Sequence, residues 1–475
     1  MPVKKSIRTD FSAATFLSSG EQERLAAIFQ RALINTDKQL IMKDDGTAYV
    51  KTGDIAAEWL RDSSAQVRPY LFFAKENKSA AAKLKAVIER QALYIAVDPY
   101  ANAFREDFVA CETKFELDSL SYPILLAWTY WKVTGDATVF TPAVKAGFDR
   151  ALETMEIEQD HDGQLPGRVK SRYKRSGKNP VGYTGMIWSA FRPSDDACKY
   201  NFLIPSQMQA VQALTALREM ETFLGCEDRA ARAGKLGAEV NAGIEKFGIV
   251  EHPKYGRIYA YEVDGLGHAN LMDDANIPSL LSIPYFGYAS ETDKIYATTR
   301  RFVLSDDNPY FYSGRFQGQD IFGVGSSHSP TGKIYSLARW ALDLTTKNRA
   351  DQAAMLKTAL PGHGAHGSNG MIWPLAQLAQ GLTTKDRAEH EKILKMLLAS
   401  DSGDHSLHES YLSDNPLVYT RKDFGWPNAL FAEFVLTVLQ GRPALPVPAP
   451  PQKLPLSAMK PVPQKDKRQK RTGGF

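Results

Sequence analysis

Cysteine is scarce in this chain, whose 475 residues include only Cys111, Cys198 and Cys226. Such a small, odd and widely spaced set argues against a disulfide framework and indicates a reducing compartment. The CxxC and HExxH patterns of zinc sites are absent, so we expect neither a metal nor another cofactor. No apolar run approaches the roughly 20 residues that a membrane span requires, and we expect no membrane partner.

The first eight residues lack the apolar core of a secretory signal, so a cytoplasmic protein is expected. Excess charge of one sign is also missing from most of the chain. The net charge is +4, but residues 453–475 alone contribute +6, from seven Lys or Arg and one Asp. The remaining body is close to neutral, which argues against a nucleic-acid partner.

Strand patterns are few, and helical periodicity dominates. Only residues 256–264 alternate as a strand does, which predicts half of a short β-hairpin. Helices are predicted over residues 21–35, 81–95, 120–133, 144–157, 207–223, 228–247, 277–288, 293–302, 373–382, 385–398 and 427–439. Long polar loops separate several of them, and loops of that length usually carry function. The pattern predicts an all-α toroid with its long loops gathered at one end.

Two further features concern the organisation of the chain. Residues 325–362 and 363–400 match at an offset of 38 with fifteen identities, which indicates a local tandem duplication, since repeat architectures need at least about three units.

Residues 443–463 hold eight of the 26 prolines, and a basic cluster follows. We therefore predict one domain over 1–442 and a disordered tail over 443–475. Nuclear targeting by the basic cluster is an alternative to a merely solvated tail.

The stretch from Thr184 to Ser206 is the richest in chemistry. It places Trp188, Arg192, Asp195 and Asp196 close together in sequence. Ser194 and the two acids match a helix start, with a serine cap and acidic residues in the first turn. An aromatic ring beside hydrogen-bonding acids also suits a sugar, which offers an apolar face and polar hydroxyls.

Seven segments together resemble glycoside hydrolase family 125, the exo-acting α-1,6-mannosidases. They are GDIAAEWLRDS (53–63), FELDS (115–119), FRPSDD (191–196), MDDANIPS (272–279), GSSH (325–328), IWPL (372–375) and HES (408–410), in order between about residues 40 and 439. The resemblance implies an (α/α)6 barrel and metal-independent, inverting hydrolysis. The implied partner is a mannose-containing oligosaccharide or N-glycan, and we expect a monomer.

The resemblance also implies roles for individual residues. Asp195 matches the family's general acid, and Glu409 matches its general base, with Leu407 where the family has Met. The further substrate-binding candidates are Trp59, Arg61, Asp62, Arg192, Asp196, Asp274, Asn276, His328, Trp373 and His408. An Arg–Asp pair such as Arg61–Asp62 can hold vicinal hydroxyls, because one side chain donates and the other accepts. Burial or the charge of Asp196 is expected to raise the pKa of Asp195.

The duplication separates GSSH from IWPL by about one repeat more than the family does. Because Trp373 matches the family's aromatic residue and Tyr335 holds its duplicate position, we expect the second copy to occupy the barrel. Two alternatives remain open. One is another inverting α-glycosidase on the same toroid, and the other is a sugar-binding pseudoenzyme. Retention of both carboxylates favours an enzyme.

Overall fold

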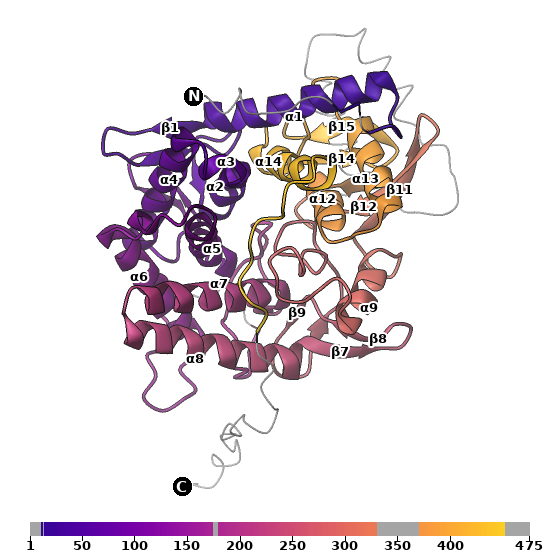
Figure 1. The fold of residues 1–475 in the computed structure, drawn as a ribbon. Helices are drawn as coiled ribbons and strands as arrows, with labels where there is room; N and C mark the ends of the chain where they lie inside the picture. Colours follow the sequence, from indigo (N-terminus) through magenta and orange to yellow (C-terminus); the bar gives the residue numbers. More distant parts are fainter. Residues whose placement is uncertain (1–10, 13, 174–178, 330–369, 452–475) are drawn as a thin grey trace, which may run out of the picture.

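The computed structural model of the protein describes residues 11–12, 14–173, 179–329 and 370–451. Its helices surround a common centre, and the chain passes around this ring from α1 to α14 (Figure 1). The α-helices are α1 (Ser19–Gln39), α2 (Leu60–Val67), α3 (Leu71–Ala74), α4 (Lys78–Val97), α5 (Leu117–Thr134), α6 (Pro142–Glu158), α7 (Ile204–Phe223), α8 (Glu227–Gly243), α9 (Lys294–Val303), α12 (Pro374–Leu382), α13 (Arg387–Ala399) and α14 (Gly425–Phe434).

The described helices form two layers. In the inner layer α5 contacts both α2 and α7, while on the other side α14 contacts both α2 and α12. In the outer layer α1 packs against α14, α8 against α7 and α13 against α12. The buried positions Leu25, Ile28, Phe29 and Leu33 of α1 follow the spacing of one helix face, which explains why this helix lies on the ring. Burial of such faces stabilises the ring, at about 1.5–3 kcal/mol for each fully buried large apolar side chain.

Ten of the eleven predicted helices are present, with shifted ends. The exception is residues 277–288, which form successive turns, with the N–H of Tyr285 bonded to the carbonyl of Ser282 and that of Gly287 to Pro284. Pro284 has no N–H and would interrupt a helix here. The segment nevertheless packs between inner helices, because Tyr285 Oη donates to Glu433 of α14 and Gln212 of α7 donates to the carbonyl of Phe286.

Short strands are more numerous than the sequence predicted. They are β1 (Leu40–Met42), β2 (Ala48–Val50), β3 (Glu58–Trp59), β4 (Ala103–Phe104), β5 (Ala110–Glu112), β6 (Phe202–Leu203), β7 (Ile249–His252), β8 (Gly256–Tyr259), β9 (Glu262–Val263), β10 (Ala269–Asn270), β11 (Phe311–Phe316), β12 (Gln319–Val324), β13 (Met371–Ile372), β14 (Ser410–Leu412) and β15 (Asn415–Thr420). The predicted hairpin is β7–β8, with Ile249 opposite Tyr259. The three-stranded sheets β3–β4–β5, β10–β9–β6 and β13–β14–β15 each contain the strand that leads into an inner helix.

After α14 the chain passes between the helices of the two halves of the ring (Figure 1). Arg442 Nη1 donates to the carbonyl of Phe72 at 2.9 Å, Gln212 Nε2 donates to that of Pro448 at 3.3 Å, and Leu445 is buried. The predicted disorder is therefore wrong for residues 443–451, where an extended segment packs without needing regular hydrogen bonding. Residues 452–475, which include the basic cluster, lie outside the described residues.

The described residues on either side of residues 330–369 approach each other. The N–H of Trp373 bonds to the carbonyl of Val324 at 3.2 Å, and Trp373 Nε1 donates to Ser329 Oγ at 2.8 Å. The described part of the second copy contributes α12 and α13, whereas most of the first copy, residues 330–362, lies outside the described residues. Among the described helices, none combines the length and hydrophobicity needed to cross a membrane.

Candidate active site

Many of the candidate residues lie where inner helices begin. Arg61 and Asp62 are in the first turn of α2, and Trp373 directly precedes α12. Glu116 directly precedes α5, and Asp118 is in its first turn. Free N–H groups give helix N-termini a partial positive charge, which favours acidic side chains there. The fold thus collects acidic groups from distant segments at these helix ends.

Asp195 and Asp196 lie in a tight turn. The N–H of Asp195 bonds to the carbonyl of Arg192 at 2.9 Å, and the N–H of Arg192 bonds to the carbonyl of Asp196 at 2.8 Å. The predicted helix start with a Ser194 cap is therefore wrong, because these backbone groups close the turn instead. Asp195 has a φ of 65°, a left-handed conformation that Asp tolerates better than most residues. The two adjacent carboxyl groups have separate sets of partners.

Arg61 is buried among four carboxyl groups. Its Nη1 lies 2.7 Å from Glu116 Oε2 and 3.2 Å from Asp118 Oδ2. Its Nη2 lies 3.2 Å from Asp62 Oδ2 and 3.8 Å from Asp195 Oδ1. One guanidinium cannot neutralise four carboxylates, and burial disfavours their charged forms. Burial accordingly raises the pKa of Asp62 and that of Asp118 to about 6.

Several buried polar atoms in this cluster have no hydrogen-bond partner within the described part of the chain. They are Trp59 Nε1, Arg61 Nε, Glu116 Oε1, Asp118 Oδ1 and Asp62 Oδ2, the last of which has only the ion-pair contact with Arg61 at 3.2 Å. Buried polar atoms are normally satisfied, and those that are not call for an explanation such as a ligand. A molecule that both donates and accepts hydrogen bonds, as a sugar does, fits this mixed set.

Asp195 is the most exposed carboxyl group of the cluster, with a side chain 20% exposed, and Asn102 Nδ2 donates to its Oδ1 at 3.1 Å. Burial raises its pKa, but Arg61, a hydrogen bond with Glu116, Lys114 and His328 outweigh burial and hold the pKa below its ordinary value. The predicted rise of the Asp195 pKa is therefore wrong for this state of the protein. The charge of Asp196 is not among the main causes of the Asp195 pKa shift.

Asp196 instead pairs with the GSSH segment. Its Oδ2 accepts from Ser327 Oγ at 2.5 Å, and its Oδ1 lies 3.2 Å from Nδ1 of His328. This hydrogen bond to Asp196 raises the pKa of His328, and the charges of Asp196, Asp195 and Glu409 act in the same direction. Asp195 and Glu409, which are 214 residues apart in sequence, therefore influence the same imidazole.

Glu409 is held by a loop that precedes α14. Arg421 Nη1 lies 3.4 Å from Glu409 Oε1, while its Nη2 lies 2.6 Å from Asp54 Oδ1. Gly53, next to Asp54, has a φ of +56°, and a Cβ there would lie 2.1 Å from the carbonyl oxygen of Asp423. Glycine thus lets the segment before α2 pack closely on the segment before α14, which places Arg421 between the two acids.

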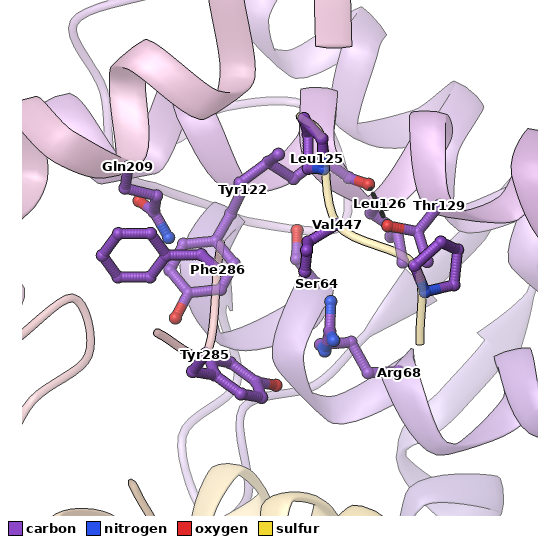
Figure 2. Close-up of a pocket in the computed structure, with 12 residues that line it drawn as sticks. Ser64, Arg68, Tyr122, Leu125, Leu126, Thr129, Gln209, Tyr285, Phe286 and Val447 are labelled. Atoms are coloured by element: carbon purple, nitrogen blue, oxygen red, sulfur yellow. Dashed lines mark hydrogen bonds between the residues drawn. The ribbon is translucent and has the colours of Figure 1, made fainter. Parts of the chain in front are cut away.

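A cavity of about 30 Å³, room for about one water molecule, lies elsewhere in the ring. Figure 2 shows its lining, which includes Arg68, Tyr122, Tyr285 and Val447. Its residues from α5 lie in the body of that helix, at least one turn from Asp118, and Val447 belongs to the C-terminal segment. The cavity is too small for a monosaccharide and is not the site formed by the acids.

The family model for metal-independent α-mannosidases of family GH125 matches residues 22–364 and 358–436. This chain belongs to that family. It is thereby a glycoside hydrolase of the α-mannosidase kind.

Two relatives and one structural neighbour accompany the family match. The meiotically up-regulated gene 157 protein of Schizosaccharomyces pombe is 33% identical over 470 residues, which is 90% of this chain and 84% of that protein. A solved metal-independent α-mannosidase from Streptococcus pneumoniae, in a non-productive complex with α-1,6-mannobiose, is 37% identical with a TM-score of 0.75, over 88% of this chain and 95% of that one. A further solved glycosidase, 14% identical with a TM-score of 0.56, covers 90% of this chain and 100% of its own, and it shows the fold alone.

Five of the predicted binding residues of this GH125 α-mannosidase make their contacts with other side chains and loops around the site. Asp274 Oδ2 accepts from Ser326 Oγ at 2.7 Å, and its Oδ1 accepts from Asn276 Nδ2 at 2.8 Å. Both residues are buried, and burial raises the pKa of Asp274. Trp373 is also buried and lies edge-on to His328. In this structure Asp274, Asn276 and Trp373 support the GSSH segment.

The fourth is His408, whose hydrogen bonds and ring stacking among the described residues are with its own loop and not with the Arg61 cluster. Its Nε2 lies 2.9 Å from Ser402 Oγ, its Nδ1 lies 3.3 Å from the carbonyl of Lys422, and its ring stacks on Tyr419 at 3.7 Å. Both ring nitrogens are thus occupied, so His408 shapes the loop that carries Glu409. Arg192 is similar, since Glu262 binds its Nε at 2.6 Å and its Nη2 at 3.0 Å.

Four further residues of this α-mannosidase site were not predicted from the sequence. They are Asn102, Glu116, Asp118 and Arg421. Glu116 and Asp118 belong to the FELDS segment that carried part of the family resemblance, so a signal for them was present. Asn102 and Arg421 are isolated polar residues in loops, and only the fold brings them to the site.

Proposed function

We propose that this α-mannosidase removes terminal α-1,6-linked mannose from a mannose-containing oligosaccharide by single displacement with inversion. The proposal includes an (α/α)6 barrel, in which residues 277–288 take the inner position between α7 and α12. Asp195 is the general acid and Glu409 the general base. The observation that carries this assignment is that the charges of Asp195 and Glu409 both raise the pKa of His328. The buried Arg61 cluster, with its unsatisfied polar atoms, contacts the same Asp195.

In the proposed reaction a mannose ring binds over the Arg61 cluster. Its hydroxyls satisfy the unpaired atoms of Trp59, Arg61, Asp62 and Asp118. Binding of these hydroxyls orients the anomeric carbon, which converts binding energy into positioning.

Asp195 then donates a proton to the glycosidic oxygen, and Glu409 removes a proton from the water that attacks the opposite face. The two carboxyl groups are expected to be roughly 6.5–9.5 Å apart, which leaves room for that water. Arg421 fixes the carboxylate of Glu409 through the contact at 3.4 Å, so the base has one orientation. The products are β-mannose and the shortened glycan.

The test is incubation of the full chain with α-1,2-, α-1,3- and α-1,6-mannobiose, followed by proton NMR. We expect mannose from the α-1,6 isomer, with the β-anomer appearing first. Release of α-mannose first would rule out inversion, and preference for another linkage would replace the proposed specificity. Binding of mannobiose without any release would indicate the sugar-binding alternative.

A further inference from the structure

Glu116 and Asp195 contact the same guanidinium, since Arg61 Nη1 lies 2.7 Å from Glu116 Oε2 and Arg61 Nη2 lies 3.8 Å from Asp195 Oδ1. A hydrogen bond between the two carboxyl groups contributes to the pKa shift of each. A carboxylate only accepts hydrogen bonds, so two of them can bond to each other only when one carries a proton. Glu116 Oε2 already accepts from Arg61 at 2.7 Å and from Ser119 Oγ at 3.0 Å, and its buried Oε1 has no hydrogen-bond partner among the described residues. Two carboxyl groups held by one guanidinium cannot both ionise freely, which favours one shared proton between Glu116 and Asp195.

The surroundings decide which partner holds this proton before substrate binds. The Glu116 side chain is fully buried, whereas that of Asp195 is 20% exposed and also accepts from Asn102. Burial, together with the charges of Asp195 and Asp118, raises the pKa of Glu116 well above its ordinary value, even though Arg61 opposes this. The charged and titratable groups that act on the pair include Arg61, Asp62, Asp118, Lys114 and His328.

We propose that Glu116 is a positioning residue that shares one proton with Asp195 and supplies it to Asp195 when the glycoside binds. This inference rests on the proposed function of Asp195 as general acid. It solves a difficulty of that assignment, because Asp195 beside Arg61 is stabilised as the anion and would otherwise have no proton to donate.

The proton balance closes without another reactant. The glycoside covers the exposed part of Asp195 and removes water from it, which favours its neutral form. The proton then moves from Glu116 to Asp195, so Glu116 becomes the carboxylate that Arg61 already contacts. Asp195 passes the proton to the glycosidic oxygen as the bond to the anomeric carbon breaks. Glu409 gains a proton from the attacking water, and exchange with solvent returns the site to its starting state.

The test compares Glu116→Gln with the wild-type chain on two substrates. α-1,6-Mannobiose has a sugar leaving group that needs a proton, whereas 2,4-dinitrophenyl α-mannoside has an acidic leaving group that does not. We expect kcat/KM to fall at least about tenfold more on mannobiose than on the aryl mannoside, since proton supply contributes factors of this order or larger. The basic limb of the kcat/KM profile on mannobiose should also move to lower pH, because the remaining carboxyl group of Asp195 has its pKa held below the ordinary value.

Asp118→Asn is the matched control. Asp118 is equally buried and contacts the same nitrogen of Arg61, but it makes no hydrogen bond with Asp195. Its loss should lower the rate on both substrates to a similar extent. In an Asp195→Asn background, Glu116→Gln should not change the ratio of the two rates further, because its effect passes through Asp195.

Equal losses of Glu116→Gln on both substrates, with an unchanged pH profile, would overturn the proposal and leave Glu116 a structural partner of Arg61. Wild-type protein that hydrolyses neither substrate would instead overturn the proposed function, and this inference with it. If Glu116→Gln does not fold, Glu116→Asp decides in the same way. It keeps a carboxyl group but withdraws it by one methylene, so a selective loss on mannobiose supports the shared proton and an equal loss refutes it.

Discussion

At the scale of single residues, Asp195 and Glu409 differ in their partners. Asp195 contacts the Arg61 cluster and Asn102, whereas Glu409 contacts Arg421. The general acid matters only when the leaving group is poor, because a poor leaving group must be protonated to depart. The general base is needed with every leaving group. The two assignments can therefore be separated by kinetics.

For Asp195→Asn we expect kcat on α-1,6-mannobiose to fall about 10²–10⁴-fold, the usual contribution of a general acid. The loss on 2,4-dinitrophenyl α-mannoside should be much smaller, since its phenolate departs unprotonated. Steady-state kinetics on both substrates measure the difference. Asp107→Asn is the control, because Asp107 is a 61%-exposed acid paired with neighbouring Arg105 and should not affect either rate. Similar losses on both substrates would remove Asp195 from the role of acid.

For Glu409→Gln we expect kcat to fall on both substrates by about 10²-fold or more, because the attacking water then lacks its base whatever the leaving group is. Azide, a small anionic nucleophile that needs no deprotonation, should restore part of the rate on the aryl mannoside and yield β-mannosyl azide. Mass spectrometry of the products checks this. Retention of wild-type turnover by Glu409→Gln would mean that another residue activates the water.

Sequence reasoning at this scale was strongest where several residues repeat a family pattern. It identified Arg61, Asp62, Asp195 and Asp196, which the fold brings close to one another. It failed on their electrostatics, because the excess of carboxyl groups around Arg61 depends on contacts between separate helices. It also assigned His408 to substrate, and this assignment stays a prediction, since in the structure the imidazole stacks on Tyr419.

At the scale of elements, β3, the strand that leads into α2, contains a buried acid. Glu58 of β3 is fully buried, its Oε2 accepts from the N–H of Val50 at 2.9 Å, and the guanidinium of Arg90 lies 3.9 Å away. Burial raises the pKa of Glu58 from 4.5 to about 8. Between these values the native chain keeps a proton that the unfolded chain releases, so this residue lowers stability as pH rises from about 4.5 to about 8.

We therefore expect the free energy of unfolding of Glu58→Gln to fall less, or rise more, with increasing pH than that of the wild type between pH 5 and 8. The difference should be at most about 1.4 kcal/mol per pH unit, the value for one proton. Urea unfolding at several pH values measures it. Glu153→Gln, which removes an acid 45% exposed, should keep the wild-type slope. An unchanged slope in Glu58→Gln would mean that Glu58 is ionised in the native protein.

Helix prediction succeeded where one apolar face repeats over several turns, as in α1 and α4. It failed at residues 277–288, where apolar spacing suggested a helix but Pro278 and Pro284 cannot donate backbone hydrogen bonds. It also failed at Ser194, where capping residues form a turn instead. Two- and three-residue strands such as β3 and β13 are too short to produce an alternating pattern, so their pairing could not be predicted.

At the scale of the whole molecule, the C-terminal segment joins the two sides of the ring. A chain that ends at Arg442 loses the buried Leu445 and the bond from Gln212 to Pro448. We expect it to be less stable by about 2 kcal/mol or more, the value of one buried leucine, with a melting temperature lower by several degrees. A chain that ends at Pro451 keeps these contacts and should melt like the full chain. Equal melting of both truncated chains would show that residues 443–451 do not contribute.

The duplication can be tested at the same scale, because the structure shows where its flanks lie. Ser329 accepts from Trp373 Nε1, and its Oγ lies 3.2 Å from that of Ser410. A Cβ added at Gly325 would lie 2.2 Å from the carbonyl oxygen of Met371, so the GSSH segment already packs directly on the start of α12. Ser329 and the residues that begin at Gly370 thus lie at neighbouring points of the described fold, and the length of chain between two such points is tolerated because closure entropy grows slowly with length.

We therefore expect deletion of residues 330–367, one complete repeat of 38, to give a folded and active protein. The deletion joins Ser329 to Ser368 and keeps the contacts of Ser329 and Trp373. Its melting temperature should equal or exceed that of the full chain, because a shorter connection between two fixed points costs less entropy to close. Deletion of the same length over residues 370–407, which include most of the second copy, removes α12 and α13 and should prevent folding. Differential scanning calorimetry and mannobiose hydrolysis compare the two. If the deletion of 330–367 aggregates, the first copy contributes to the core, and the second copy does not fill this part of the ring alone.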